Sequence, residues 1–166
     1  MSNNLNRNLH KLGKTYNSLM QWLSWLLWLQ ERNRLFNGWF AESSNEYYID
    51  WAANEIEEIR ETIRDGNHDE LELEVGDLLW DVLSLINKLD REKLVDRDRV
   101  CVRAVAKFAE RMPYNVEGYF EWDMQRRHDT WESAKKLQKL RGIDENHPLV
   151  QKVWSSVQRE ERKEKK

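Results

Sequence analysis

Glycine, proline and cysteine are all scarce in this sequence, and their scarcity narrows the choice of fold. The 166 residues include six Gly and two Pro, whereas average usage would supply about twenty of the two together. Turn-rich β architectures and collagenous or low-complexity chains are therefore disfavoured. The only cysteine, Cys101, cannot form an internal disulfide, which favours a reducing compartment and a packed, inert thiol.

The sequence also lacks an excess of positive charge and a long apolar run. Its formal net charge is -3, which supplies no general attraction for nucleic acid or for an anionic membrane. The longest apolar run, residues 19–29, is too short to cross about 30 Å of hydrocarbon. We therefore expect a soluble, cytoplasmic protein with no nucleic-acid partner and no membrane span.

Apolar and charged residues are both abundant, as in chains built from amphipathic helices. Hydrophobic residues make up 40% of the sequence and charged residues 34%, which suits helices with one apolar stripe each. The length is typical of one domain. We therefore predict an all-α fold and a single domain over residues 1–166, with its core in residues 15–140 and a C-terminal helix and charged tail over residues 146–166.

Apolar spacing and capping residues predict the individual helices. Ser44 or Asn45 is a candidate N-cap for the second helix, and Gly66 suits the left-handed position after its end. Asp69, paired with Glu72, is expected to begin the third helix. The second and third helices would therefore form a hairpin. The expected helices cover residues 15–32, 46–65, 69–90, 97–111 and 117–140, and a last one begins near Pro148.

This hairpin carries two mirrored pairs of acidic residues. Glu55 and Glu58 are three residues apart on one helix, as are Glu74 and Asp77 on the other, so each pair is adjacent on its helix surface. Because the pairs are symmetric about Gly66, an antiparallel hairpin places Glu58 opposite Glu74 and Glu55 opposite Asp77. We therefore predict that the four carboxylates converge on Mg²⁺, with Mn²⁺ as an alternative, since both ions prefer hard oxygen ligands.

Other interpretations of these acidic residues stay open. Asp81 continues the face of Glu74 and is a candidate ligand for a second ion or a water. Acidic pairs of this spacing are also common as solvated surface charge, in which case no metal binds. A ferritin-like di-iron centre is disfavoured because the sequence has no Glu-x-x-His step.

Three motifs in this order resemble those of the MazG-type all-α nucleoside triphosphate pyrophosphohydrolases. The acidic pairs match the family's ExxE, spacer, ExxD signature. Residues 107–113, Lys-Phe-Ala-Glu-Arg-Met-Pro, resemble its basic segment KxxxRHP, and residues 131–135, Trp-Glu-Ser-Ala-Lys, resemble its WExxK. The resemblance covers about residues 30–140.

The departures from the family pattern fall outside the acidic motif. Residues 37–40 are Asn-Gly-Trp-Phe where the family often has Cys-Pro-Trp-Asp, and residues 111–116 are Arg-Met-Pro-Tyr-Asn-Val where it has RHPHVF. These differences concern recognition of the base.

The resemblance implies an activity and a role for each motif. The reaction would be hydrolysis of the α–β phosphoanhydride of a (d)NTP to (d)NMP and pyrophosphate, with Mg²⁺ on the four carboxylates. Glu55 or Glu58 would be the general base. Lys107 and Arg111 would be catalytic residues that bind the triphosphate.

The same resemblance extends to the second basic motif. Lys135 would add a third positive charge at the phosphates. Trp131 would stack on the base, although a core role for this indole is an equal alternative.

Two alternatives for the function differ in kind. The first is a pyrophosphatase of the same superfamily that acts on dUTP, dCTP or phosphoribosyl-ATP, and the second is a non-catalytic helical interaction module. For the assembly, we expect a homo-oligomer, a dimer or tetramer, because pairing hairpins would complete a four-helix-bundle-like core. The aromatic surface of Trp22, Trp25 and Trp28 is a candidate for part of the interface.

Overall fold

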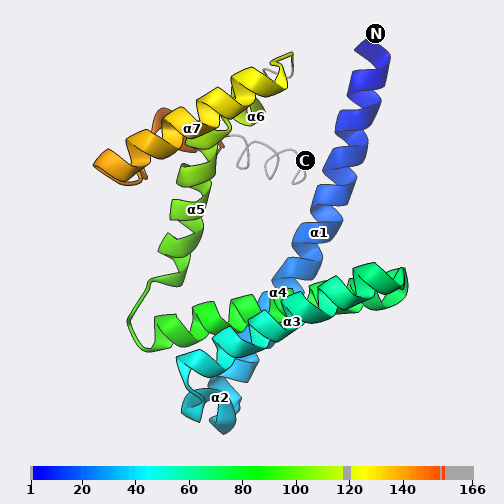
Figure 1. Ribbon diagram of the computed structural model, residues 1–166, viewed down its shortest axis with the longest axis vertical. Coiled ribbons are helices and arrows are strands. Elements are labelled where there is room, and N and C mark those ends of the chain that lie inside the picture. Colours follow the sequence, from blue (N-terminus) through cyan, green and yellow to red (C-terminus); the bar gives the residue numbers. More distant parts are fainter. Residues whose placement is uncertain (1, 118–120, 154, 156–166) are drawn as a thin grey trace, which may run out of the picture. The chain divides into compact units, whose positions relative to one another are not determined.

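The computed structural model describes residues 2–117, 121–153 and 155. This part of the chain contains no strand, so the prediction of an all-α fold is confirmed. The helices are α1 (Ser2–Phe36), α2 (Gly38–Glu42), α3 (Asn45–Asp65), α4 (His68–Arg91), α5 (Arg97–Arg111), α6 (Pro113–Glu117) and α7 (Met124–Arg141) (Figure 1).

The chain divides into two compact units. Met1–Val95 contains α1 to α4, and Asp96–Lys166 contains α5 to α7. The assignment of residues 1–166 to a single domain stays a prediction. Among the described residues, no helix is both long enough and apolar enough to cross a membrane.

The first unit is built around the predicted hairpin, in which α3 and α4 pack along their length (Figure 1). The Ser44 side chain accepts a hydrogen bond from the Tyr47 N–H at 3.1 Å, so the expected cap of α3 is confirmed. Gly66 ends α3 with φ of 70°, a left-handed conformation that glycine adopts without a steric penalty. The hairpin therefore has the turn that its sequence predicts.

The capping residue of α4 differs from the prediction. The Asn67 side chain accepts a hydrogen bond from the Glu70 N–H at 3.4 Å, and α4 begins at His68. Asp69, the expected cap, lies inside the first turn instead. The reason is that Asn67 directly follows the left-handed Gly66, so its side chain reaches the free N–H groups of the helix first.

Two other helix boundaries differ from the sequence-based expectation. The first helix was expected over residues 15–32, and α1 instead runs from Ser2 to Phe36. The helix expected over residues 117–140 begins only at Met124, because the Asp123 side chain caps it by accepting the Arg126 N–H at 2.8 Å. Residues 148–153 are helical, as expected, and the charged tail from Arg159 lies outside the described residues.

A buried polar contact joins α1 to the helix that carries Glu74. Gln30 has no exposed surface, and its Nε2 donates hydrogen bonds to the Trp80 carbonyl at 3.0 Å and to Ser84 Oγ at 2.8 Å. Ser84 in turn donates to Gln30 Oε1 at 3.2 Å. This exchange fixes the position of α1 along α4.

The second unit is held by contacts between α5 and α7. Ala106, Ala109 and Ala134 are buried, and such small side chains let two helix backbones approach closely. Gln138 Nε2 on α7 donates to the Lys107 carbonyl on α5 at 3.1 Å. The two helices therefore carry the basic motif and the Trp-Glu-x-x-Lys motif on one packed pair.

Candidate metal centre

Three of the four predicted metal ligands meet on the hairpin. Glu55, Glu58 and Glu74 each offer a carboxylate oxygen, and these oxygens lie within 4.8 Å of one another. Glu55 and Glu74 are half-buried, and Glu58 is exposed. The turn at Gly66 produces this convergence, because it places the two helices antiparallel with one acidic pair on each.

Asp77, the fourth predicted ligand, lies outside this group of three. It follows Glu74 by about one helical turn on α4 and is exposed. Its negative charge nevertheless contributes to raising the pKa values of Glu55, Glu74 and Asp81, so the four predicted ligands share one electrostatic environment. A metal-binding role for Asp77 stays a prediction.

The crowding of negative charge is strongest at Glu55. Desolvation by burial raises the pKa of this carboxyl to about 7, and repulsion from Glu58, Asp81, Asp77 and Glu74 adds to the rise. Without a cation, Glu55 therefore holds a proton for much of the time at neutral pH. A divalent ion would replace that proton and neutralise the repulsion, so hard oxygen donors in this arrangement fit Mg²⁺ or Mn²⁺.

Glu74 is affected in the same direction. Burial raises its pKa first, followed by repulsion from Glu58, Asp77 and Glu70, whereas a hydrogen bond with the Glu55 side chain opposes the rise. This hydrogen bond crosses the hairpin from α3 to α4. A proton held by Glu55 is thus stabilised by the neighbouring carboxylate.

Asp81 extends the row of acidic residues into the core. The residue is 4% exposed, and burial, followed by the charge of Asp77, raises its pKa. Its own charge contributes in turn to raising the pKa values of Tyr47 and Tyr48, for which burial is the larger cause. The suggestion that Asp81 holds a second ion or a water stays a prediction.

An aromatic cluster without an assigned function is formed by α2 and the first turns of α3. The ring of Tyr47 is 4.5 Å from that of Trp51 and 5.1 Å from that of Trp39, measured between centroids. Trp51 precedes Glu55 by about one turn. In the sequence, only the family resemblance draws attention to Trp39. Trp39, Tyr47 and Trp51 follow no regular spacing, so the sequence pattern does not predict that their rings meet.

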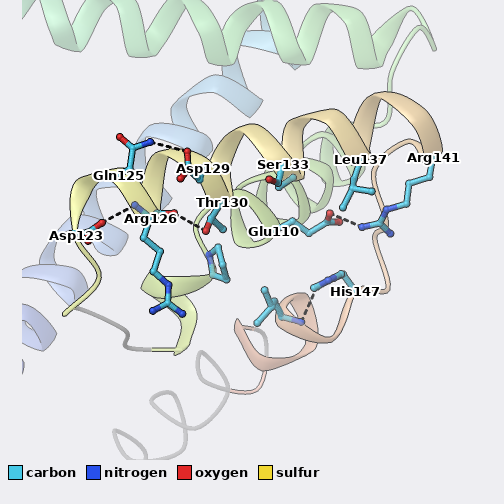
Figure 2. Close-up of a pocket in the computed structure, with 13 residues that line it drawn as sticks. Glu110, Asp123, Gln125, Arg126, Asp129, Thr130, Ser133, Leu137, Arg141 and His147 are labelled. Atoms are coloured by element: carbon cyan, nitrogen blue, oxygen red, sulfur yellow. Dashed lines mark hydrogen bonds and ion pairs between the residues drawn. The ribbon is translucent and has the colours of Figure 1, made fainter.

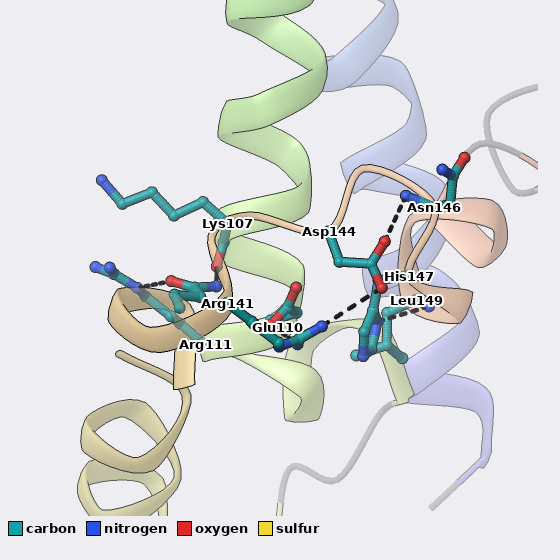
Figure 3. A network of polar contacts seen from close by, with 9 residues as sticks. Lys107, Glu110, Arg111, Arg141, Asp144, Asn146, His147 and Leu149 are labelled. Atoms are coloured by element: carbon teal, nitrogen blue, oxygen red, sulfur yellow. Dashed lines mark hydrogen bonds and ion pairs between the residues drawn. The ribbon is translucent and has the colours of Figure 1, made fainter. Parts of the chain in front are cut away.

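The predicted phosphate-binding residues lie in the second unit, on α5 and α7. Arg111 Nε donates to Gln138 Oε1 at 2.8 Å (Figure 3). Its guanidinium carbon is 5.2 Å from the centroid of the Trp131 ring. Lys135 forms an ion pair with Glu132 at 3.2 Å. Lys107 Nζ is 5.5 Å from the Phe108 ring.

Trp131 packs between two helices, whereas the sequence left a core role and a base-stacking role as equal alternatives. Its ring lies 6.1 Å from that of Phe108, in addition to its contact with Arg111. These contacts hold the indole between α5 and α7, and its role in base stacking stays a prediction.

Comparisons with known proteins find one matching family model and one similar fold. Residues 43–116 match the model of the MazG nucleotide pyrophosphohydrolase domain. The fold is similar to a crystal structure of a MazG-related protein from Thermotoga maritima, with 26% sequence identity and a TM-score of 0.63, over 68% of this chain and 98% of that chain. No curated protein sequence matches. The matched region includes all four predicted metal ligands.

Proposed function

We propose that this chain, whose residues 43–116 match the model of the MazG nucleotide pyrophosphohydrolase domain, hydrolyses the α–β phosphoanhydride of (d)NTPs with Mg²⁺ as cofactor. The observation that carries the proposal is the convergence of Glu55, Glu58 and Glu74 within 4.8 Å. Water adds to one phosphorus of the anhydride, the bridging P–O bond breaks, and (d)NMP and pyrophosphate leave.

The carboxylates of the hairpin would hold the metal. Glu55, Glu58 and Glu74 supply the converging oxygens, and Asp77 is the fourth proposed ligand. Bound Mg²⁺, or Mn²⁺ in its place, would withdraw negative charge from the phosphate oxygens. The same carboxylates orient the attacking water by accepting its hydrogen bonds.

A carboxylate of this set would also take the proton that the attacking water loses. Glu55 and Glu58 are the two candidates.

The basic residues of the second unit would bind the triphosphate. Arg111 presents a planar group suited to paired hydrogen bonds with phosphate oxygens, while Lys107 and Lys135 add positive charge. Trp131 would contribute a flat surface for the base.

We propose a homo-oligomer, a dimer or tetramer, in the cytoplasm as the working form. Ile49, Ile56 and Ile63 follow one another at seven-residue spacing on α3 and are 52%, 42% and 61% exposed. Such a row of exposed isoleucines suits a helix that packs against a second copy.

The function is tested by measuring pyrophosphate release from purified protein with Mg²⁺. The substrate panel contains the standard NTPs and dNTPs together with dUTP and phosphoribosyl-ATP. Turnover of several (d)NTPs supports the proposal, and turnover of dUTP, dCTP or phosphoribosyl-ATP alone supports the related pyrophosphatase. Absence of turnover and of Mg²⁺ binding would leave the non-catalytic interaction module.

A further inference from the structure

The tryptophan-rich part of α1 has little cover from the described part of the chain. Trp22, Trp25 and Trp28 are 69%, 54% and 49% exposed. Between residues 18 and 36, Gln30 alone is buried, and it is the residue that meets α4. At about 100° per residue, Trp25 and Trp28 lie about 140° and 160° around the helix from Gln30. These two indoles therefore occupy the side of α1 that faces away from α4.

An exposed arginine is stacked into the same row of rings. Trp25 and Trp28 meet edge to face, with their ring centroids 5.8 Å apart. The guanidinium carbon of Arg32 is 5.0 Å from the centroid of Trp28 and 5.2 Å from that of Phe36. Because Arg32 is exposed, one side of the helix presents a positive charge together with aromatic surface.

The charge of this helix is opposite in sign to that of the whole chain. The sequence of α1 contains five basic residues and one acidic residue, Glu31, whereas the chain has a net charge of -3. The basic residues at positions 7, 11 and 14 follow a spacing of three and four residues that continues through Ser18 to Trp22 and Trp25. Helix periodicity assigns such positions to one face. The row of tryptophans therefore continues a row of basic positions.

The indole nitrogens distinguish between two ways of covering this face. Each tryptophan carries one N–H donor. Packing against the same apolar face of a second copy would leave these donors without acceptors, which is unfavourable. The headgroup layer of a bilayer supplies acceptor oxygens and water at the depth where tryptophan rings concentrate. The basic residues favour a layer that is negatively charged.

We propose that the exposed face of α1 binds the surface of an anionic lipid bilayer. The rings of Trp22, Trp25 and Trp28 would lie among the headgroups, and Arg32 would meet lipid phosphate. The helix would lie on the bilayer without crossing it, since no helix among the described residues is able to span a membrane. The proposal does not rest on the hydrolytic function.

Sedimentation of the full chain with lipid vesicles tests the proposal. The vesicles contain phosphatidylcholine alone, or equal parts of phosphatidylcholine and phosphatidylglycerol. The partition coefficient should be at least about tenfold higher for the anionic vesicles, because each basic residue near such a surface adds electrostatic attraction. Lack of binding to the anionic vesicles, or equal binding to both kinds, would overturn the proposal.

Replacement of the three indoles locates the contact. The triple Trp variant, Trp22→Ser/Trp25→Ser/Trp28→Ser, should lower the partition coefficient onto anionic vesicles by at least about a hundredfold, because binding strength scales with the apolar area that enters the interface. Circular dichroism verifies that the variant is folded. Binding by the folded variant as tight as by the wild type would contradict the assignment to α1.

A matched control removes exposed apolar side chains from other helices. Leu73, Met124 and Leu140 are exposed and lie outside α1. The variant Leu73→Ser/Met124→Ser/Leu140→Ser should bind anionic vesicles as the wild type does. An equal loss of binding in this control would show a general effect of surface hydrophobicity and would overturn the proposal.

The role of Arg32 is tested against a second arginine that also stacks on an indole. The guanidinium carbon of Arg126 is 4.1 Å from the centroid of Trp122, but Arg126 lines a cavity of about 720 Å³ together with Asp123 and Asp129 (Figure 2). Arg32→Gln should lower partition onto anionic vesicles about fivefold and leave partition onto neutral vesicles unchanged. Arg126→Gln should change neither, and equal effects of the two substitutions would contradict the role of Arg32.

A second copy of the chain on this face is the alternative that the experiment separates. Light scattering without lipid compares the mass of the wild type with that of the triple Trp variant. An equal mass, with vesicle binding lost, supports the lipid contact. A lower mass for the variant, with no vesicle binding by the wild type, would assign the face to contact between copies and overturn the proposal. Pyrophosphate release is not measured here, so failure of this proposal is distinct from failure of the proposed hydrolysis.

Discussion

The side chains of Glu55 on α3 and Glu74 on α4 share a hydrogen bond across the hairpin, and their carboxylate oxygens lie within 4.8 Å of each other. Two carboxylates hold such a contact through a proton when no cation lies between them. Proton and divalent metal therefore compete for the same position, and this competition connects the pH dependence of stability to metal binding.

In metal-free buffer, we expect Glu55 to make the protein less stable as the pH rises from 5 to 8. Burial and the neighbouring acids raise its folded pKa to about 7 from an ordinary value of 4.5. The stability contributed by this proton is fully present below the ordinary pKa and is lost as the pH rises through the folded pKa. Urea unfolding in EDTA at pH 5 and pH 8 should show a smaller loss for Glu55→Gln than for wild type, and equal losses would contradict the assignment.

A second prediction concerns the three converging carboxylates in catalysis. Glu55→Gln, Glu58→Gln and Glu74→Gln should each lower kcat/KM for pyrophosphate release by at least about a hundredfold, because each removes a charge that holds Mg²⁺. The stabilisation of the fold by added Mg²⁺ in thermal unfolding should also decrease. Glu57→Gln is the matched control, because Glu57 is exposed and forms an ion pair with Arg60 instead.

A third prediction separates substrate binding from folding. Lys107→Ala should raise KM for the nucleotide with little change in the free energy of unfolding, because its ammonium group lies over the Phe108 ring and forms no ion pair with any residue that the structure describes. Arg111→Ala should raise KM and also destabilise the second unit, since it loses both the Gln138 hydrogen bond and the contact with Trp131. Unchanged kcat and KM in the Lys107→Ala/Arg111→Ala double variant would mean that these residues do not bind the substrate.

The contact between α1 and α4 gives a fourth prediction. Gln30→Leu should destabilise the fold by about 1–3 kcal/mol, because the buried Ser84 hydroxyl loses its partner. Denaturant unfolding measures this change. The double variant Gln30→Leu/Ser84→Ala should recover part of the loss, since it removes both polar groups; no recovery would mean that the hydrogen bonds are not the cause.

The last prediction concerns assembly. Light scattering coupled to size exclusion should give at least twice the chain mass of 20.2 kDa. Ile56→Glu places a charge in the exposed isoleucine row of α3 and should shift the protein toward the monomer. A wild-type mass near 20 kDa at micromolar concentration would refute the oligomer.

Local sequence determined much of the first unit. The seven-residue and three-to-four-residue spacing of apolar positions predicted α3 and α4, and Ser44 and Gly66 predicted the ends of α3 because their roles depend only on adjacent backbone groups. The positions of the acidic pairs about the turn were enough to predict that Glu55, Glu58 and Glu74 meet. Boundaries were wrong where two residues compete for one cap, as Asn67 and Asp69 do.

Contacts between residues distant in sequence were decided only by the tertiary structure. The pKa of Glu55 depends on burial between two helices and on charges from α4, which helix periodicity does not describe. The hydrogen bonds of Gln30 with Ser84 arise from packing, as does the burial of Glu110 Oε1, which has no hydrogen-bond partner among the described residues. No local pattern marks these residues, because their environment is created when separate helices meet and exclude water.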